Sequence, residues 1–197
     1  MAHALQPITV DEFVRLVPEG EKADLLDGVI VMASPDSPRS AKVNGFLGFL
    51  LLGYARTKQL GEVFGPRSAF ALSDIYAPEP DIAFVRAGRD HLWRGSCFQG
   101  PPDIAVEIVA PDSVERDTET KRLVYERACV PEYWIVDLVE DRCRFLALEQ
   151  ARYKAVELEG GCNFRSQALH GFWLDTRWLL QAELPDPLEC LHGVLRA

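Results

Sequence analysis

The sequence has few of the features that would assign a chain of 197 residues to a membrane, zinc-binding or disulfide-rich class. Its longest apolar run, Phe46 to Tyr54, is interrupted by glycines and is too short to span a bilayer, so we expect no membrane segment. The five cysteines include no CxxC pair, and the four histidines lie far from them in the sequence. This spacing offers neither a zinc signature nor a disulfide framework, and we expect reduced thiols in a cytoplasmic protein.

Basic residues and nucleotide-binding motifs are also scarce. Lysine and arginine number 21 against 30 acidic residues, and the formal net charge of −9 argues against a broad basic face. Nucleic acid is less favoured as a partner but not excluded, because an acidic cluster that binds Mg²⁺ reverses its local charge. The chain contains no GxGxxG, Walker A, GxSxG or HExxH motif. We therefore expect no nucleotide cofactor and no serine-hydrolase or zincin chemistry.

The order of apolar patterns predicts one domain over residues 1–197, of the α/β class, with a mixed central sheet flanked by helices. A capping box at Thr9 and Glu12 begins a short helix, and Asp27-Gly28 between two apolar runs predicts a hairpin. Apolar residues at helical spacing predict a long helix from Arg39 to Lys58. Other strands are expected over 61–64, 68–72, 131–137, 142–148, 153–158 and 164–169, and other helices over 112–128 and 176–182.

The segment from Pro102 to Asp137 reads as strand, turn, helix and strand, and packing alone does not explain its charged residues. Glu107 interrupts an apolar run, where a carboxylate buried without a partner is costly. Asp81 begins a second β-rich run, and Arg86 to Pro101 between the two runs is predicted to be a loop with a short helical turn. Strands joined by a loop can be antiparallel neighbours, which would bring both carboxylates together.

Two interpretations of these acids remain open. Like charges about 4 Å apart repel by roughly 4 kcal/mol at an effective dielectric constant of about 20, so converging carboxylates need a cation or a shared proton. Hard oxygen ligands of this kind favour Mg²⁺ or Mn²⁺. Alternatively, Glu107 forms a salt bridge with an arginine or lysine of the helix, and Asp81 stands in a turn, a cap or a strand edge. The pattern does not decide between the two.

The helix after Glu107 poses a similar choice. Asp117, Lys121 and Tyr125 are spaced to share one face. They could form a surface pair with a half-buried tyrosine, or they could point at the strand edge, where Lys121 would hold a phosphate and orient water. Asp24 alternates with apolar neighbours in the hairpin and could face the same cleft. Elsewhere a structural role is the better interpretation, for packing at 131–134, a turn at Asp137 and solvated side chains at His91 and His170.

Four stretches of the chain resemble a known family: LLDGVIVMASPDSPR, PEPDIAFV, PPDIAVEIVAPDS and RDTETKRLVYERACVPEYWIVD. They are similar to the Uma-two family, a bacterial group described as "putative restriction endonuclease", within the PD-(D/E)XK nuclease superfamily. The similarity covers roughly residues 8–185, which we take as the core of the domain. It implies a restriction-endonuclease-like fold, two-acid Mg²⁺-dependent hydrolysis of phosphodiester bonds, DNA as the substrate and a homodimer.

The resemblance also assigns roles to residues. Asp81 and Glu107 match the two metal-binding acids, helped by the backbone carbonyl of Ile108. Lys121 matches a lysine that this family carries on the helix, and Asp24 stands where the family usually has glutamate. Four positions depart from the family or superfamily pattern: Val109 for the superfamily lysine, Ser40 for a common histidine, Ala110 for serine and Cys129 for glycine.

The leading hypothesis is therefore an Mg²⁺- or Mn²⁺-dependent DNA endonuclease with Asp81, Glu107, Lys121 and Asp24 at its catalytic site. An alternative from a different class is a catalytically inactive module of the same fold that dimerises and binds DNA or a protein. The altered auxiliary positions and the acidic net charge of −9 motivate this alternative. A stand-alone structural protein is a third interpretation.

Overall fold

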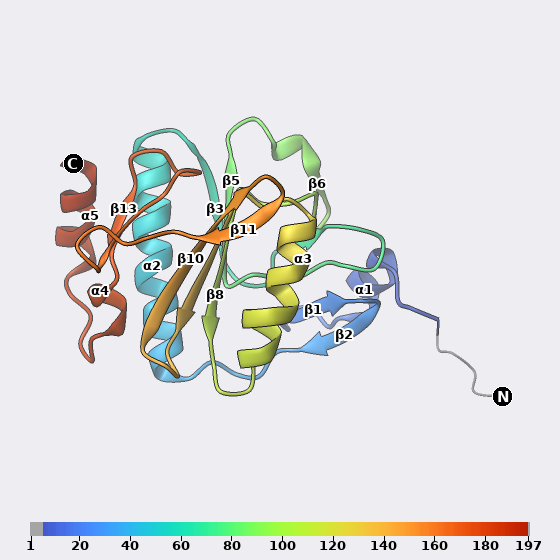
Figure 1. The fold of residues 1–197 in the computed structure, drawn as a ribbon. Coiled ribbons are helices and arrows are strands. Elements are labelled where there is room, and N and C mark those ends of the chain that lie inside the picture. Colours follow the sequence, from blue (N-terminus) through green and yellow to red (C-terminus); the bar gives the residue numbers. More distant parts are fainter. Residues whose placement is uncertain (1–5, 197) are drawn as a thin grey trace.

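The computed structural model describes residues 6–196. Its centre is a six-stranded sheet with the strand order β11-β10-β9-β8-β5-β3 (Figure 1). The pair β8–β9 is parallel, and the other neighbouring pairs are antiparallel. The strands are β3 (Gly61–Phe64), β5 (Ile82–Arg86), β8 (Ile104–Val109), β9 (Glu132–Asp137), β10 (Arg142–Glu149) and β11 (Arg152–Ala155). The expected mixed α/β architecture is confirmed.

Helices and two small hairpins cover the two faces of this sheet (Figure 1). One face carries the long helix α2 (Pro38–Thr57), with α4 (Arg177–Leu180), α5 (Pro187–Arg196) and the hairpin of β12 (Asn163–Arg165) and β13 (Trp173–Asp175) around it. The other face carries α3 (Lys121–Arg127), the hairpin of β1 (Ala23–Leu26) and β2 (Val29–Met32), and α1 (Val10–Leu16). The site residues come from this second side.

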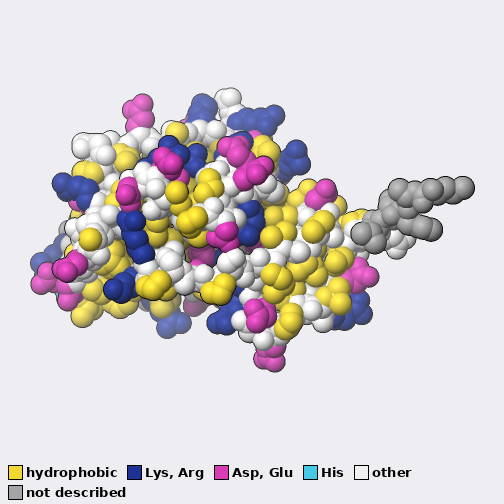
Figure 2. Space-filling model, turned by 90° about the horizontal axis from the view of Figure 1, so that it is seen from below, with side chains coloured by type: hydrophobic (Ala, Val, Ile, Leu, Met, Phe, Trp, Pro, Cys, Tyr) yellow, Lys and Arg dark blue, Asp and Glu magenta, His cyan; other side chains and the backbone are white. Residues whose placement is uncertain are grey.

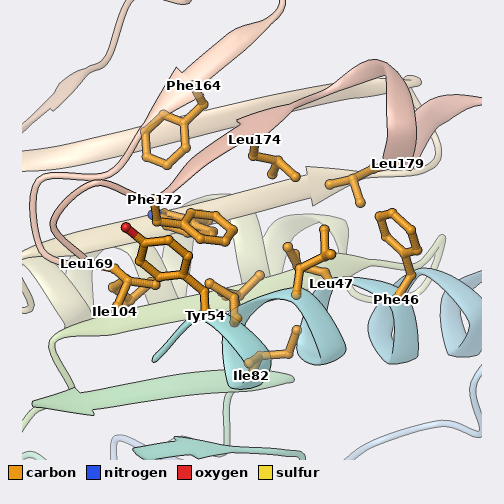
Figure 3. Close-up of a cluster of buried hydrophobic side chains, with 14 of the residues drawn as sticks. Phe46, Leu47, Tyr54, Ile82, Ile104, Phe164, Leu169, Phe172, Leu174 and Leu179 are labelled. Carbon is orange, nitrogen blue, oxygen red and sulfur yellow. The ribbon is translucent and has the colours of Figure 1, made fainter. Parts of the chain in front are cut away.

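The main core lies between the sheet and the α2 side. Figure 3 shows the side chains of α2, including Phe46, Leu47 and Tyr54, pointing toward those of the C-terminal segment. Tyr54 also donates a hydrogen bond of 3.1 Å to the carbonyl of His170, which ties α2 to that segment. This packing covers the α2 face of the sheet. The charged residues of the site lie on the opposite side.

Alternation along β8 decides where Glu107 points. Ile104, Val106 and Ile108 pack into the core with α2. Ala105 and Val109 pack with Tyr125 on the other face. Because side chains alternate along a strand, Glu107 stands on the α3 side between two apolar neighbours.

A long connection joins β5 to β8. The two strands are antiparallel neighbours, with Ile82 opposite Val106. The sequence-based prediction of antiparallel neighbours is confirmed. The connection contains the 3₁₀ turn η1 (Asp90–Leu92) and two strands that the loop prediction missed. These strands, β6 (Trp93–Arg94) and β7 (Cys97–Gln99), pair with each other, and β7 also pairs with β4 (Ala69–Ala71) in a separate sheet.

Most local predictions are confirmed, but the strand expected over 153–158 ends at Ala155 and other details differ. The capping box, the early hairpin and α2 lie within a residue of their expected bounds. The helix expected over 112–128 begins at Val114, directly after Ser113, and the Ser113 hydroxyl hydrogen-bonds the backbone of Ala110 instead of capping the helix. The strand expected at 164–169 ends at Arg165, and α5 was not predicted.

The state of the cysteines and the length of the helices agree with what the sequence predicts. All five cysteines are free. Over residues 6–196, the helices are too short or too polar to cross a bilayer.

Candidate functional site

Asp81 sits at the junction of β5 and β8, just before β5 begins. Its N–H donates to the carbonyl of Val106 at 3.0 Å, and its Oδ2 accepts from the N–H of Ile108 at 2.7 Å. The side chain therefore extends the ladder between the two strands by one more hydrogen bond. Its second oxygen, Oδ1, accepts from the ammonium of Lys22.

Glu107 is almost fully buried, with 1% of the residue exposed. Its Oε1 accepts from Lys121 Nζ and from the hydroxyl of Tyr125, each at 3.0 Å. Both donors come from α3, so the expected shared face of that helix does point at the strand. The second oxygen of Glu107, Oε2, accepts from neither of these two donors.

Lys121 is as buried as Glu107, with 1% exposure. Its ammonium contacts Glu107 at 3.0 Å, Asp24 at 2.9 Å and Asp117 at 3.9 Å. Burial lowers the pKa of this lysine, and the attraction of Asp24, Glu107 and Asp117 more than reverses the effect, so the pKa is raised. Lys121 therefore remains charged and links three carboxylates.

Asp24 reaches the same cluster from β1. Its Oδ1 accepts from the N–H of Glu79 at 2.8 Å and contacts Lys121, while Oδ2 lies 3.6 Å from Arg116 Nε. The hairpin is held beside the strand ends by these contacts. The structure thus brings Asp24, Asp81, Glu107 and Lys121 together from four separate parts of the chain.

Three residues of this cluster were not singled out from the sequence. Lys22 contacts Asp81 from 59 positions away, so no local pattern points to it. Arg116 contacts both Asp24 and Asp117. Its position next to Asp117 in the sequence is the one feature that could have pointed to it. Glu79 accepts from the N–H of Ala23 at 3.2 Å, and burial raises its pKa to about 7.

A cavity of about 450 Å³ opens beside these groups. Asp81, Glu107 and Ile108 form part of one wall, and Lys22 and Arg116 also line it. Lys121 and Asp24 do not line it, and these two residues are only 1% and 2% exposed. The loop from β8 into the helix lies at the bottom of Figure 1, next to the β1–β2 hairpin.

Burial controls the protonation of Glu107. Burial raises the pKa of this carboxyl, Lys121 opposes the rise, and Asp117 and Asp81 add to it. A further positive charge near Oε2 would lower the pKa again. A cation that approaches Glu107 from the cavity would therefore stabilise its ionised form.

The oxygen atoms around the cavity suit a hard divalent cation. The carboxylates of Asp81 and Glu107 line it, as do those of Glu21, Asp36, Asp112 and Asp117. The backbone carbonyl of Ile108 points to the same side as its N–H, past the beginning of β5 at Ile82. Within residues 6–196 no three histidine, cysteine, aspartate or glutamate side chains are grouped so as to hold a metal ion. A metal would thus be held by Asp81, Glu107 and Ile108 with water completing its shell, and Lys22 would have to leave Oδ1 of Asp81.

The structure shows the surroundings of two of the departures from the family or superfamily pattern. Val109 packs in the apolar cluster with Tyr125, and the ammonium that meets Glu107 comes from Lys121 on the helix. Ser40 is buried and contacts Ser37 at the beginning of α2, at 2.8 Å between the hydroxyl oxygens. Neither Val109 nor Ser40 lines the cavity.

The structure thus places Asp81, just before β5, and Glu107, within β8, on the wall of one cavity, with Lys121 of α3 in contact with Glu107. The family model described as "Putative restriction endonuclease" matches residues 10–177, and the chain belongs to this family, Uma2. The resemblance inferred from the sequence motifs is confirmed.

A solved structure shares the fold. It is that of a putative nuclease belonging to DUF820 from Anabaena variabilis, with a TM-score of 0.73 and 16% sequence identity. The match covers 88% of this chain and 98% of that one. No curated protein matches the chain.

Proposed function

We propose that the protein is a divalent-metal-dependent endonuclease that hydrolyses phosphodiester bonds in DNA. The observation that carries the proposal is the meeting of Asp81 and Glu107, from neighbouring strands, on the wall of one cavity with cationic residues around them. Membership of a family described as restriction endonucleases supports it. Mg²⁺ or Mn²⁺ is the cofactor, and a cytoplasmic homodimer is part of the proposal.

Each residue has a distinct part in this proposal. A bound Mg²⁺ would supply a water of lowered pKa and would stabilise charge on the phosphate. Asp81 and Glu107 would hold it together with the carbonyl of Ile108. The N–H of Ile108 fixes the orientation of Asp81, and Tyr125 fixes that of Glu107. Lys121 contacts Glu107 and Asp24 and acts as a positioning residue for these two carboxylates.

A catalytically inactive module that binds DNA or a protein partner is the second candidate. The observation that favours it is that both acids already contact a lysine, Asp81 through Lys22 and Glu107 through Lys121. Such pairs can be purely structural. The face of the molecule in Figure 2 also mixes acidic, basic and hydrophobic side chains without a broad basic area.

Cleavage of supercoiled plasmid and of single-stranded DNA tests the proposal. We expect the purified protein to nick or linearise DNA with Mg²⁺ or Mn²⁺ and to stop when EDTA is added. Glu107→Gln should lower the rate at least about a hundredfold, because the ligand charge at the metal is lost. Glu157→Gln, which removes an exposed carboxylate, should cleave as the wild type does.

The two candidates give opposite results. Cleavage that survives in the folded Glu107→Gln variant would rule out the assignment of Glu107. Absence of cleavage by the wild type on every DNA form, together with DNA binding that does not depend on metal, would favour the inactive module.

A further inference from the structure

Two lysines contact the paired acids, and they differ in their access to the cavity. Lys121 has 1% of its surface exposed and contacts Glu107 and Asp24. Lys22 contacts Asp81, its side chain is 22% exposed, and it lines the cavity. Of these two ammonium groups, that of Lys22 can reach a molecule in the cavity.

We infer that Lys22, rather than Lys121, is the lysine that binds the phosphate, and that a divalent cation must first displace it from Asp81. This inference rests on the proposed function and names a further catalytic residue for it. Lys22 is then a counter-ion of Asp81 in the metal-free protein and a phosphate ligand in the loaded one.

The hydrogen bonds of Asp81 carry the first part of the argument. Oδ2 accepts from the N–H of Ile108 at 2.7 Å. Ile108 belongs to the central strand β8, so this donor is fixed in place. The oxygen left for a metal is Oδ1, which is the oxygen that Lys22 contacts. An ammonium and a divalent cation beside the same oxygen repel each other, so the two compete for it.

The second part is the mobility of the two side chains. The carbonyl of Lys22 accepts from the N–H of Ala33 at 2.9 Å, so its backbone is fixed by the β1–β2 hairpin. Its side chain has a flexible four-carbon stem and one carboxylate partner, and it can swing without disturbing β1. Lys121 would have to leave Asp24, Glu107 and Asp117 together.

The charges around the cavity give the third part. Six acidic side chains line it, against three basic ones: Glu21, Asp36, Asp81, Glu107, Asp112 and Asp117 against Lys22, Arg67 and Arg116. A divalent cation would reduce this excess of negative charge. A phosphodiester carries one negative charge, and the ammonium of Lys22, once released from Asp81, would offset it.

The test is the Lys22→Met variant, compared with Lys42→Met, which removes the same charge from an exposed position on α2. We expect Lys22→Met to bind Mn²⁺ about tenfold more tightly than the wild type by calorimetry, because the competitor is gone. The same variant should bind a DNA duplex more weakly in Ca²⁺, and the slope of log affinity against log salt should fall by about one. Lys42→Met should leave both the metal affinity and the slope unchanged.

These opposite changes distinguish the inference from a structural role. A variant with unchanged or weaker Mn²⁺ binding overturns the inference while the wild type still binds, and the proposed function then stands. If neither the wild type nor Lys22→Met binds Mn²⁺ at millimolar concentration, the proposed function fails as well.

A measurement on the wild type keeps the inference testable if Lys22→Met does not fold. In an ammonium-selective ¹H–¹⁵N spectrum, assigned with Lys22→Arg, the Lys22 signal should shift or broaden as Mg²⁺ is added. The Lys121 signal should move much less. A Lys22 signal that stays in place at saturating Mg²⁺ overturns the inference.

Discussion

At the residue scale, the site depends on how burial and pairing oppose each other. An isolated carboxylate as buried as Glu107 would be strongly destabilising, and Lys121 and Tyr125 make it tolerable by donating to Oε1. Lys121 in turn is buried because three carboxylates surround it. The salt-bridge interpretation is therefore confirmed for Glu107, which pairs with a helix lysine, while the binding of a cation by the two acids stays a prediction.

Sequence patterns predicted part of this arrangement. The apolar alternation around Glu107 and the loop connection to Asp81 were sufficient to place the two acids on neighbouring strands. Contacts between distant segments were not predictable in the same way. Lys22 and Asp81 are separated by 59 positions, and neither the charge nor the local spacing of Lys22 differs from that of a surface lysine.

Glu79 provides a prediction on pH at this scale. Burial raises its pKa from 4.5 to about 7, so the folded protein holds this proton more tightly than the unfolded chain does. The unfolding free energy should therefore fall as pH rises from about 4.5 to about 7, and then level off. Glu79→Gln lacks this pH dependence, so its stability relative to the wild type should increase by about 1–3 kcal/mol across that window.

Urea unfolding at pH 5 and pH 8 measures this difference. Glu157→Gln, in which an exposed carboxylate is removed, is the matched control and should show no change with pH relative to the wild type. A Glu79→Gln variant whose relative stability is the same at both pH values would show that Glu79 is ionised in the folded protein throughout.

At the scale of elements, the chain between β8 and α3 does not form one regular helix. It contains a π-helix, η2 (Arg116–Thr120), and then continues as α3. The hydroxyl of Tyr133 on β9 donates to the carbonyl of Asp117 at 2.6 Å and so satisfies a carbonyl of this wide turn. This turn places Arg116 on the cavity wall and leaves Lys121 and Tyr125 facing Glu107.

The apolar period predicted a helix in this region but not its change of winding. Tyr133, which contacts this turn, belongs to a different element, and no local propensity encodes such a contact. The short strands β6 and β7 were missed for a related reason, since β7 is also paired with β4, which is distant in sequence. Capping boxes and Asp-Gly turns are local, and they were predicted correctly.

Glu132 joins β9 to the C-terminal segment, and its removal gives a prediction about elements. Its carboxylate is 2% exposed as a residue and accepts from Trp134 Nε1, Ser166 Oγ and the N–H of Ala168 at 2.8–2.9 Å. Because hydrogen bonds to a charged group contribute about 1.5–3 kcal/mol each, Glu132→Ala should lower the unfolding free energy by at least about 3 kcal/mol.

Denaturant unfolding with Glu140→Ala as the control checks this value. Glu140 is exposed in the turn after β9, and its loss should change stability by less than about 0.5 kcal/mol. A Glu132→Ala variant as stable as the control would show that the segment around Ser166 is held by apolar packing alone.

At the scale of the whole molecule, one face of the sheet carries a large apolar core, and the other face carries smaller apolar clusters together with the charged groups. The α2 side buries a large apolar cluster against the C-terminal segment (Figure 3). The α3 side gathers seven charged residues from the hairpin, the strand ends and the helix, and their charges nearly cancel. The cavity beside them is lined by six acidic and three basic side chains, so its local charge has the same sign as the net charge of −9.

The central claim is that Asp81 and Glu107 together bind one divalent cation. The most direct test is a calorimetric titration of Mn²⁺ into the wild type, Glu107→Gln and the control Glu157→Gln. In Glu107→Gln the new amide oxygen can still accept from Tyr125, and Asp24 and Asp117 still hold Lys121, so the fold should be retained. We expect one site per chain in the wild type and the control, and at least about tenfold weaker binding in Glu107→Gln. No heat from the wild type at millimolar Mn²⁺, or equal affinity in the folded Glu107→Gln variant, would contradict the account.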